Sequence, residues 1–358
     1  MHERKVAVAA IKISSSGPRR ILEEFLEHAD YYATRENIKF DIYIGLKSDS
    51  FECYDNIEFK EVNRIFLTSY LFRFIWDNIV VRKLSRKNKY IHWFSIQDFS
   101  LNVTVPHSVY IHNPLFYAKS NFFWIRYDLK EALRALVMKI FIGWKISTNS
   151  FIIVQQNFVK NQLIDKYKKL PRILVAPPRG IYSEALSIGS PRKVVCNTFF
   201  YPAMPRIFKG HTFCFECALS APNQIFYVTL NGTENRLSRM LFRRYGHLEN
   251  IKWLGKLSKE EVAIHYASCD FVFFPSELET WGLPLTEARS FGKPLLVTSD
   301  AEYLEGPLGG YESVFSIRRE VDDFMEFIEN PLKYKINISE NDNVIDWSAI
   351  CRLIDNDI

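Results

Sequence analysis

Two glutamates, Glu279 and Glu287, stand eight positions apart on either side of a glycine, Gly282. The stretch before them, 269–275, is short and apolar, which is typical of a strand in a parallel sheet. Pro284 suits the first turn of a helix, because its missing N–H group would be unpaired there anyway. The pattern predicts a strand, a tight loop and a helix start, with both carboxylates able to face one ligand.

A loop of this kind can hold two different groups of one ligand. The unpaired amides at a helix start attract phosphate, and a glycine lets the backbone approach closely. Carboxylates cannot grip phosphate, but they accept hydrogen bonds from sugar hydroxyls. The combination describes a site for a nucleotide sugar. A surface loop with solvated glutamates is the weaker interpretation, because strand, glycine, proline and spaced acids coincide.

The segment 273–287, with its run Glu-Thr-Trp-Gly-Leu-Pro, resembles the E-x7-E signature of retaining glycosyltransferases of family 4, which have the two-domain GT-B fold. It is most similar to the bacterial enzymes that build O-antigen, lipopolysaccharide and other surface polysaccharides. The resemblance implies that Glu279 meets hydroxyls of the donor sugar and that Glu287 binds the ribose. Many members have Phe at position 281, a difference that leaves the backbone role untouched. The resemblance also implies that amides of the loop meet the diphosphate, from Thr280, Trp281, Gly282 and Leu283.

A second candidate is the loop 201–210, directly after the first strand expected in the second half. Ligands of doubly wound sheets bind at the carboxyl ends of the strands. Cations there could offset the charge that builds on a departing nucleotide diphosphate. The family places an Arg five or six positions before a Lys in this loop. Arg206 precedes Lys209 by only three positions, so Lys209 carries over better, and solvated loop charges remain the alternative for both.

In the first half, His112 follows an apolar strand at 109–111, where some family members have a His-x-Pro. It could hydrogen-bond the donor sugar or orient the acceptor hydroxyl, although a structural histidine is the alternative. Residues 95–98, after the preceding strand, could line the same cleft. Gly17 lies where the family has a glycine-rich turn near the donor, and a plain connecting turn explains it equally well.

Composition is that of a large soluble enzyme. The 358 residues are 47% hydrophobic and 24% charged, enough for two domains with a core each. The net charge of +5 is too small to indicate nucleic-acid binding, and no nucleic-acid motif is visible. Cys214 and Cys217 form one C-x-x-C without the further ligands of a zinc site, so two buried thiols are expected and no metal. Without a signal peptide or an apolar run of about 18–20 residues, a cytoplasmic protein is expected.

Repeated strand–helix–strand patterns predict an α/β protein, in which parallel sheets are covered on both faces. With the resemblance, the expected architecture is GT-B: two Rossmann-like parallel-sheet domains facing each other across a cleft. A Gly, Ser and Pro-rich stretch at 188–191 suggests the linker. We predict an acceptor-side domain over 1–187, a nucleotide-sugar domain over 188–335, and a C-terminal segment over 336–358, whose helix packs on the first domain in resembling enzymes. Strands are predicted over 5–11, 40–45, 90–95, 108–112, 151–155, 173–176, 193–201, 225–230, 251–253, 271–274 and 295–298.

Basic and aromatic residues gather in two stretches of the first half. Residues 64–93 contain seven Lys and Arg residues, one acidic residue and seven aromatic residues. Residues 117–146 contain six Lys and Arg residues, two acidic residues and seven aromatic residues. Such stretches suit a membrane interface, where rings lie at headgroup level and cations meet anionic lipid. An aromatic stripe that faces the core, with a solvated basic back, explains them equally well.

The expected function is transfer of a sugar from a nucleotide-sugar donor to a bacterial surface glycan such as O-antigen. An acceptor on a lipid carrier, at the inner face of the cytoplasmic membrane, would fit the basic and aromatic first half. Retention of configuration rests on the resemblance alone, and the nucleotide sugar is a substrate, so no cofactor is expected. Two alternatives remain: a GT-B epimerase or hydrolase that needs no acceptor, and a non-catalytic partner in a polysaccharide assembly complex.

Overall fold

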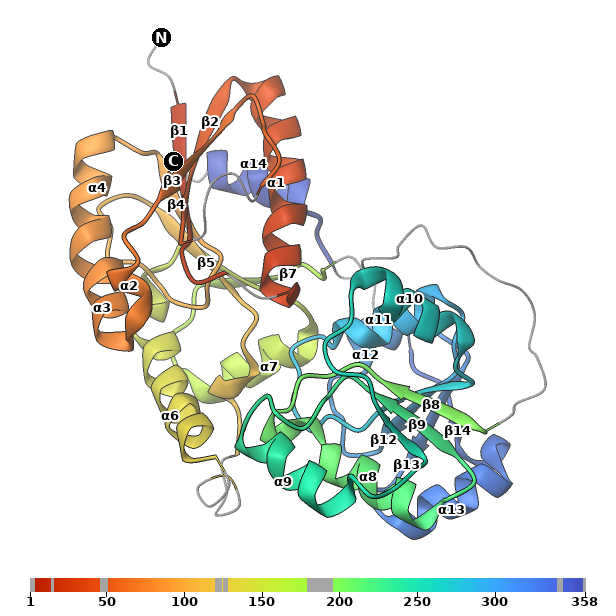
Figure 1. The fold of residues 1–358 in the computed structure, drawn as a ribbon. Coiled ribbons are helices and arrows are strands. Elements are labelled where there is room, and N and C mark those ends of the chain that lie inside the picture. Colours follow the sequence, from red (N-terminus) through yellow and green to blue (C-terminus); the bar gives the residue numbers. More distant parts are fainter. Residues whose placement is uncertain are drawn as a thin grey trace. The chain divides into compact units, whose positions relative to one another are not determined.

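A computed structural model describes residues 4–13, 16–45, 51–119, 124, 128–178, 196–339 and 344–356. The chain is α/β and forms two seven-stranded sheets (Figure 1). Its contacts define two compact units, the first within 1–117, 137–178 and 342–358, and the second within 118–136 and 179–341. The predicted class, an α/β chain with two Rossmann-like parallel-sheet domains, is confirmed.

The first sheet has the strand order β3-β2-β1-β4-β5-β6-β7, and all its pairings are parallel. Its inner strands are buried along nearly their whole length, because helices cover both faces. The strand order reverses between β1 and β4. The strands are β1 (Arg4–Ala10), β2 (Ile38–Ile44), β3 (Ile57–Glu61), β4 (His92–Ser95), β5 (His107–Ile111), β6 (Phe151–Val154) and β7 (Arg172–Val175).

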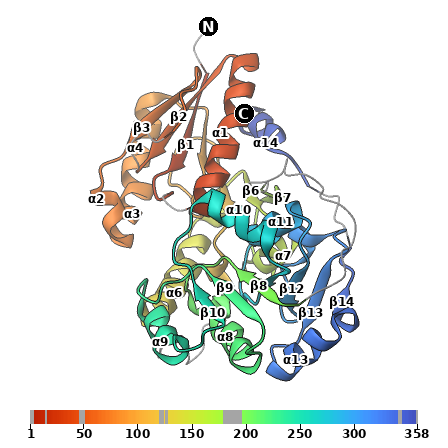
Figure 2. The ribbon, with the colours of Figure 1, turned by 45° about the vertical axis from the view of Figure 1, so that its right-hand side comes forward.

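Helices α1 and α14 lie on one face of this sheet, and α3 and α4 lie on the other (Figures 1 and 2). The side chains alternate accordingly along β1, so that Val6 and Val8 join one core while Ala7 and Ala9 join the other. The helices are α1 (Ser16–Glu36), α2 (Ile65–Thr68), α3 (Tyr70–Ile75), the π-helical η2 (Trp76–Val80), α4 (Val81–Asn88), the 3-10 turns η3 (Pro114–Phe116) and η4 (Ile146–Thr148), α6 (Leu129–Gly143), α7 (Asn157–Lys166) and α14 (Trp347–Asn356).

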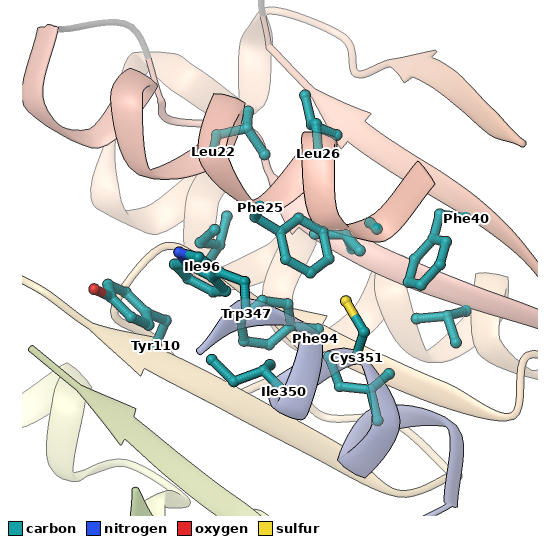
Figure 3. Close-up of a cluster of buried hydrophobic side chains, with 14 of the residues drawn as sticks. Leu22, Phe25, Leu26, Phe40, Phe94, Ile96, Tyr110, Trp347, Ile350 and Cys351 are labelled. Carbon is teal, nitrogen blue, oxygen red and sulfur yellow. The ribbon is translucent and has the colours of Figure 1, made fainter. Parts of the chain in front are cut away.

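The last helix completes the core of the first unit. Trp347 at its start is buried against Phe25 of α1, with ring centroids 5.7 Å apart, and against Tyr110 of β5, 5.2 Å apart (Figure 3). Truncating a buried Trp to Ala costs about 3–5 kcal/mol of stability. This helix therefore holds the end of the chain in the first unit.

The second sheet has the order β10-β9-β8-β11-β12-β13-β14, parallel except for the last pair. Here the order reverses between β8 and β11. The strands are β8 (Thr198–Tyr201), β9 (Ile225–Val228), β10 (Ile251–Trp253), β11 (Phe271–Phe274), β12 (Leu295–Thr298), β13 (Val314–Ile317) and β14 (Lys335–Ile336). The helices are α8 (His211–Ser220), α9 (Arg236–Tyr245), α10 (Lys259–Ser268), α11 (Leu283–Ser290), α12 (Glu305–Leu308) and α13 (Val321–Glu329), with 3-10 turns η5 (Ile207–Lys209) and η6 (Pro331–Tyr334).

The units differ from the predicted domains at residues 118–136 and at 336–341, since 336–341 also belong to the second unit, where Ile336 pairs with Val314 of β13. Residues 118–136 belong to the second unit, because Trp124 stacks on Phe208 with ring centroids 5.7 Å apart and Arg206 lies 3.4 Å from Glu131. The predicted linker at 188–191 lies outside the described residues. The boundary between 187 and 188 therefore stays a prediction.

Candidate active site

The order of the second sheet brings two distant loops together. β8 and β11 are neighbours, but the chain leaves β8 toward β9 on one side and leaves β11 toward β12 on the other. The loops that follow β8 and β11 therefore start side by side and diverge, which leaves a crevice for a ligand in sheets of this type. The first loop contains Lys209 and the second contains Glu279.

Backbone contacts hold the two loops against each other. The amide of Glu277 donates to the carbonyl of Phe208 at 2.8 Å. Gly210 has φ +67°, and a Cβ placed on it would lie only 2.0 Å from the carbonyl oxygen of Pro275. Only glycine fits this close approach, so Gly210 fixes where the preceding Lys209 can point.

The side chains of Lys209 and Glu279 form an ion pair. Both are largely removed from solvent, with 17% of the Lys209 side chain and 11% of the Glu279 side chain exposed. The ammonium group also lies 5.8 Å from the ring centroids of Phe208 and Phe274. An ammonium group in such partly dry surroundings interacts strongly with an anion, because little water screens it.

The loop after β11 turns into helix α11 at Gly282, which has φ +83° and is the N-cap residue. Pro284 stands in the first helical turn, as predicted. Glycine has no side chain with which to cap the helix, so the first amides of this helix start can meet an anion, whereas the amide of Leu285 already donates to the carbonyl of Gly282 at 2.8 Å. Thr280 and Trp281 are buried beside it, while Leu283 is half-buried.

The second acid of the motif, Glu287, lies in α11 and is also buried. The hydroxyl of Tyr266, on α10, donates to its Oε2 at 2.8 Å. Burial raises the pKa of the Glu287 carboxyl above its ordinary value, and the hydrogen bond from Tyr266 opposes this rise. Tyr266 was missed from the sequence, because an aromatic residue on an unremarkable helix gives no signal of a polar contact.

Arg319 is a second residue that sequence analysis missed. Its guanidinium donates to the carbonyl of Pro275 at 2.9 Å and to Oγ1 of Thr298 at 3.0 Å, and it pairs with Asp300 at 3.1 Å. It therefore connects the ends of β11, β12 and β13 and supports the loop that carries Glu279. Arg206 lies elsewhere in the Lys209 loop and pairs with Glu131 on α6 at 3.4 Å.

In the first unit, His112 follows β5, as predicted. The carboxylate of Asp98 accepts from the amides of His112 and Asn113 at 2.8 and 3.0 Å, and lies 3.6 Å from Nδ1 of the His112 ring. Asp98 has φ +72°, a conformation that Asp tolerates better than most residues. Asp98 thus holds the His112 backbone in place.

Gly17, the other candidate in the first unit, lies in the first turn of α1.

Three further expectations concern metals, thiols and membranes. Cys214 and Cys217 are free, buried thiols on α8, as predicted, and burial raises the pKa of each. Among the described residues, His, Cys, Asp and Glu side chains form no group of three that could hold a metal ion. None of the helices in the described part of the chain combines the length and apolar character needed to cross a membrane.

Residues 220–325, which include Glu279 and Glu287, match the family model described as Glycosyl transferases group 1. No curated protein sequence matches the chain. Solved structures of similar fold include WaaG, a glycosyltransferase involved in lipopolysaccharide biosynthesis (TM-score 0.66, 15% identity, 92% of this chain and 90% of that one). The lipopolysaccharide outer core galactosyltransferase WaaB is also similar (TM-score 0.63, 12% identity, 98% and 94%). So is the UDP-GlcNAc 2-epimerase of Methanocaldococcus jannaschii (TM-score 0.52, 11% identity, 98% and 99%).

These likenesses to solved structures show the fold, whereas the family match covers part of the second unit. The chain therefore has a GT-B fold, and residues 220–325 of its second unit are similar to group 1 glycosyl transferases.

Proposed function

We propose that the protein is a retaining glycosyltransferase that takes its sugar from a nucleotide-sugar donor. The observation that carries the proposal is the Lys209–Glu279 pair beside the uncapped start of α11, at the reversal point of the second sheet. A cation and a helix start suit a diphosphate, and a buried carboxylate suits sugar hydroxyls. The group 1 match over 220–325 supports the same reaction class.

In the proposed reaction, the bond between the sugar C1 and the diphosphate oxygen breaks, and a bond from C1 to the acceptor oxygen forms. Negative charge builds on the leaving diphosphate, where the Lys209 ammonium and the amides at Gly282 would stabilise it. Glu279 would bind hydroxyls of the sugar, and Glu287 would bind the ribose. His112 would contact the donor sugar or orient the acceptor hydroxyl, whose proton would pass to the departing diphosphate as the new bond forms.

The finer assignment concerns the acceptor. WaaG and WaaB act in the assembly of lipopolysaccharide, and the first half of this chain has the basic and aromatic stretches that a lipid-carried acceptor would suit. We propose a bacterial surface glycan on a lipid carrier, such as O-antigen, met at the inner face of the cytoplasmic membrane. We also propose that Thr280, Trp281 and Leu283 help to bind the diphosphate, that Arg206 and Gly17 lie near the donor, and that neither metal nor cofactor takes part.

A second candidate is an epimerase or hydrolase that acts on the nucleotide sugar alone. It is favoured by the similarity to the UDP-GlcNAc 2-epimerase, which extends over 98% of this chain. Both reactions use the same kind of donor, so donor binding does not separate them. The need for an acceptor does.

The test begins with a panel of sugar nucleotides, each scored for the rise in melting temperature that a bound ligand produces. The donor that stabilises the protein is then incubated with and without a lipid-linked glycan, with chelator present throughout. Transfer only when the glycan is present supports the proposal. Conversion or hydrolysis of the donor alone would favour the second candidate, and stabilisation without turnover would favour a non-catalytic binding protein.

A further inference from the structure

Helix α6 carries an apolar stripe on its outer face. Leu129, Leu133, Leu136 and Ile140 follow one another at intervals of four, three and four residues, which places them on one side of a helix. Each is between 53% and 57% exposed. Trp144, directly after the helix, is 48% exposed. We call these five side chains the α6 stripe.

The fold does not need the α6 stripe for its core. The opposite side of α6 supplies the buried residues Ala135, Met138 and Ile142. The helix is thus apolar on two sides, although one apolar side is enough to attach a helix to a globular protein. Large exposed apolar areas on soluble proteins commonly mark a surface that binds a partner or a membrane.

Further apolar side chains lie beside the end of α6. The ring of Phe74, on α3, contacts those of Phe141 and Trp144, with centroids 5.7 and 5.9 Å apart. Leu71, on the same short helix, is 67% exposed. The exposed apolar surface therefore continues from α6 onto α3.

The segments that carry this surface, 64–89 and α6, have mostly positive charges. In residues 64–89 the single acid is Asp77, which is buried and pairs with Arg73 at 2.8 Å, while six other Lys and Arg remain. On α6 the single acid is Glu131, which is also buried and pairs with Arg134 and Arg206. The charges that reach solvent on these elements are cations, among them Lys83, Arg86, Lys87 and Lys130.

We propose that the α6 stripe is a docking surface for a membrane of anionic phospholipids. Apolar side chains would enter the boundary between headgroups and acyl chains, and the surrounding cations would meet the lipid phosphates. The half-exposed indole of Trp144 suits that boundary, where Trp is enriched. The inference deepens the proposed function, on which its biological sense rests, because a lipid-carried acceptor would be met at such a surface.

Vesicle flotation of the full chain tests the proposal. Vesicles of phosphatidylcholine with phosphatidylglycerol should carry the protein at low salt, and vesicles of phosphatidylcholine alone should carry much less. Leu133→Ser with Ile140→Ser should weaken vesicle binding at least tenfold, because the two apolar side chains that would insert into the lipid are removed. Both side chains are exposed, so the core of the protein should be unaffected. Lys83→Gln with Lys87→Gln should weaken vesicle binding several-fold for each charge removed, because each cation near the surface adds to the attraction for anionic lipid. High salt should weaken vesicle binding as well, because it screens the same attraction.

Leu219→Ser with Leu332→Ser is the matched control, because both leucines are at least half exposed but lie outside the α6 stripe, on α8 and η6. This control should bind vesicles like the wild type. Absence of vesicle binding, or equal loss in control and stripe variants, would overturn the proposal. Self-association without lipid that the stripe variant abolishes would assign the surface to a second copy instead.

The two proposals fail separately. Donor binding, measured as thermal stabilisation by the sugar nucleotide without vesicles, should be unchanged in the stripe variant. Vesicle binding with no response to any sugar nucleotide would leave the docking surface intact and count against the proposed function. Stabilisation by a sugar nucleotide without vesicle binding would support the proposed function and count against the docking surface.

Discussion

Lys209 and Glu279 are 70 positions apart in the sequence, yet their side chains form an ion pair at the reversal point of the second sheet. The pair joins a cation suited to a leaving diphosphate to an acid suited to a sugar. Without donor, each charge neutralises the other. A bound diphosphate would compete with Glu279 for the ammonium of Lys209 and free the carboxylate for the sugar hydroxyls.

Removing the Lys209 ammonium should nearly abolish transfer. We expect Lys209→Ala to lower kcat about 100-fold, the usual loss for one contact that stabilises a developing charge. Circular dichroism should show that the variant stays folded. Lys252→Ala is the control, because Lys252 is exposed and its ammonium contacts only the carbonyl of Glu249 among the described residues. Activity within a fewfold of wild type in Lys209→Ala would remove Lys209 from the mechanism.

Tyr266 should act on donor affinity through Glu287. Tyr266→Phe removes the hydroxyl that donates to Glu287 and keeps the ring that stacks on Phe291. A lost hydrogen bond to a charged group is worth about 1.5–3 kcal/mol, so KM for the donor should rise roughly tenfold or more while kcat changes little. Tyr311→Phe is the control, because its hydroxyl donates to the carbonyl of Lys293, outside the proposed donor site. An equal KM in both variants would contradict the role of Tyr266.

Much of the second sheet's site could be predicted because its signals are local. The strand β11, the loop at Gly282 and the start of α11 are encoded by neighbouring residues, and the structure has them where expected. The pairing of Lys209 with Glu279 could not be predicted, since it depends on β8 lying next to β11. Strand order is set by packing across the whole sheet.

Other parts were missed for physical reasons. The edge strand β3 reads Ile-Glu-Phe-Lys-Glu, and such an exposed, charged strand lacks the apolar run that marks an inner strand. Strand β14 has only two residues and exists through its antiparallel pairing with β13. The hydrogen bond from the amide of His112 to Asp98 depends on the positive φ of Asp98. A positive φ can be predicted from sequence for glycine but not for other residues.

Asp98 should be replaceable by Asn but not by Ala. Its carboxylate accepts from the amides of His112 and Asn113, and Asn supplies one oxygen and tolerates a positive φ. Asp98→Asn should retain most of the stability and activity, whereas Asp98→Ala should lose about 1–3 kcal/mol of stability, because two amides lose their acceptor. Urea unfolding of both variants measures this. Equal stability of the two variants would show that Asp98 does not hold His112 in place.

Glu287 should make stability depend on pH. Because burial raises its pKa, the folded protein keeps this proton to higher pH than the unfolded chain, whose carboxyl titrates near 4.5. The folded state then binds more protons, so this group lowers stability as pH rises above about 4.5. In urea unfolding at a series of pH values, the free energy of unfolding of Glu287→Gln should rise relative to that of the wild type as the pH increases above about 4.5. The control Glu249→Gln, at an exposed position, should show the same pH dependence of stability as the wild type. A difference in stability between Glu287→Gln and the wild type that does not change with pH would contradict a raised pKa of Glu287.

Three buried histidines should make the protein sensitive to mild acid. Burial lowers the pKa of His92 to about 3, of His107 to about 4 and of His211 to about 3. The unfolded chain takes up these protons below pH 6.5, so each histidine costs about 1.4 kcal/mol of stability for each pH unit below that value until the folded pKa is reached. Comparison of urea unfolding at pH 7.5 and 5.5 should show a steep loss. His211→Gln should flatten the dependence and the exposed His247→Gln should not, whereas equal slopes in the two variants would show that His211 is not held neutral by the fold.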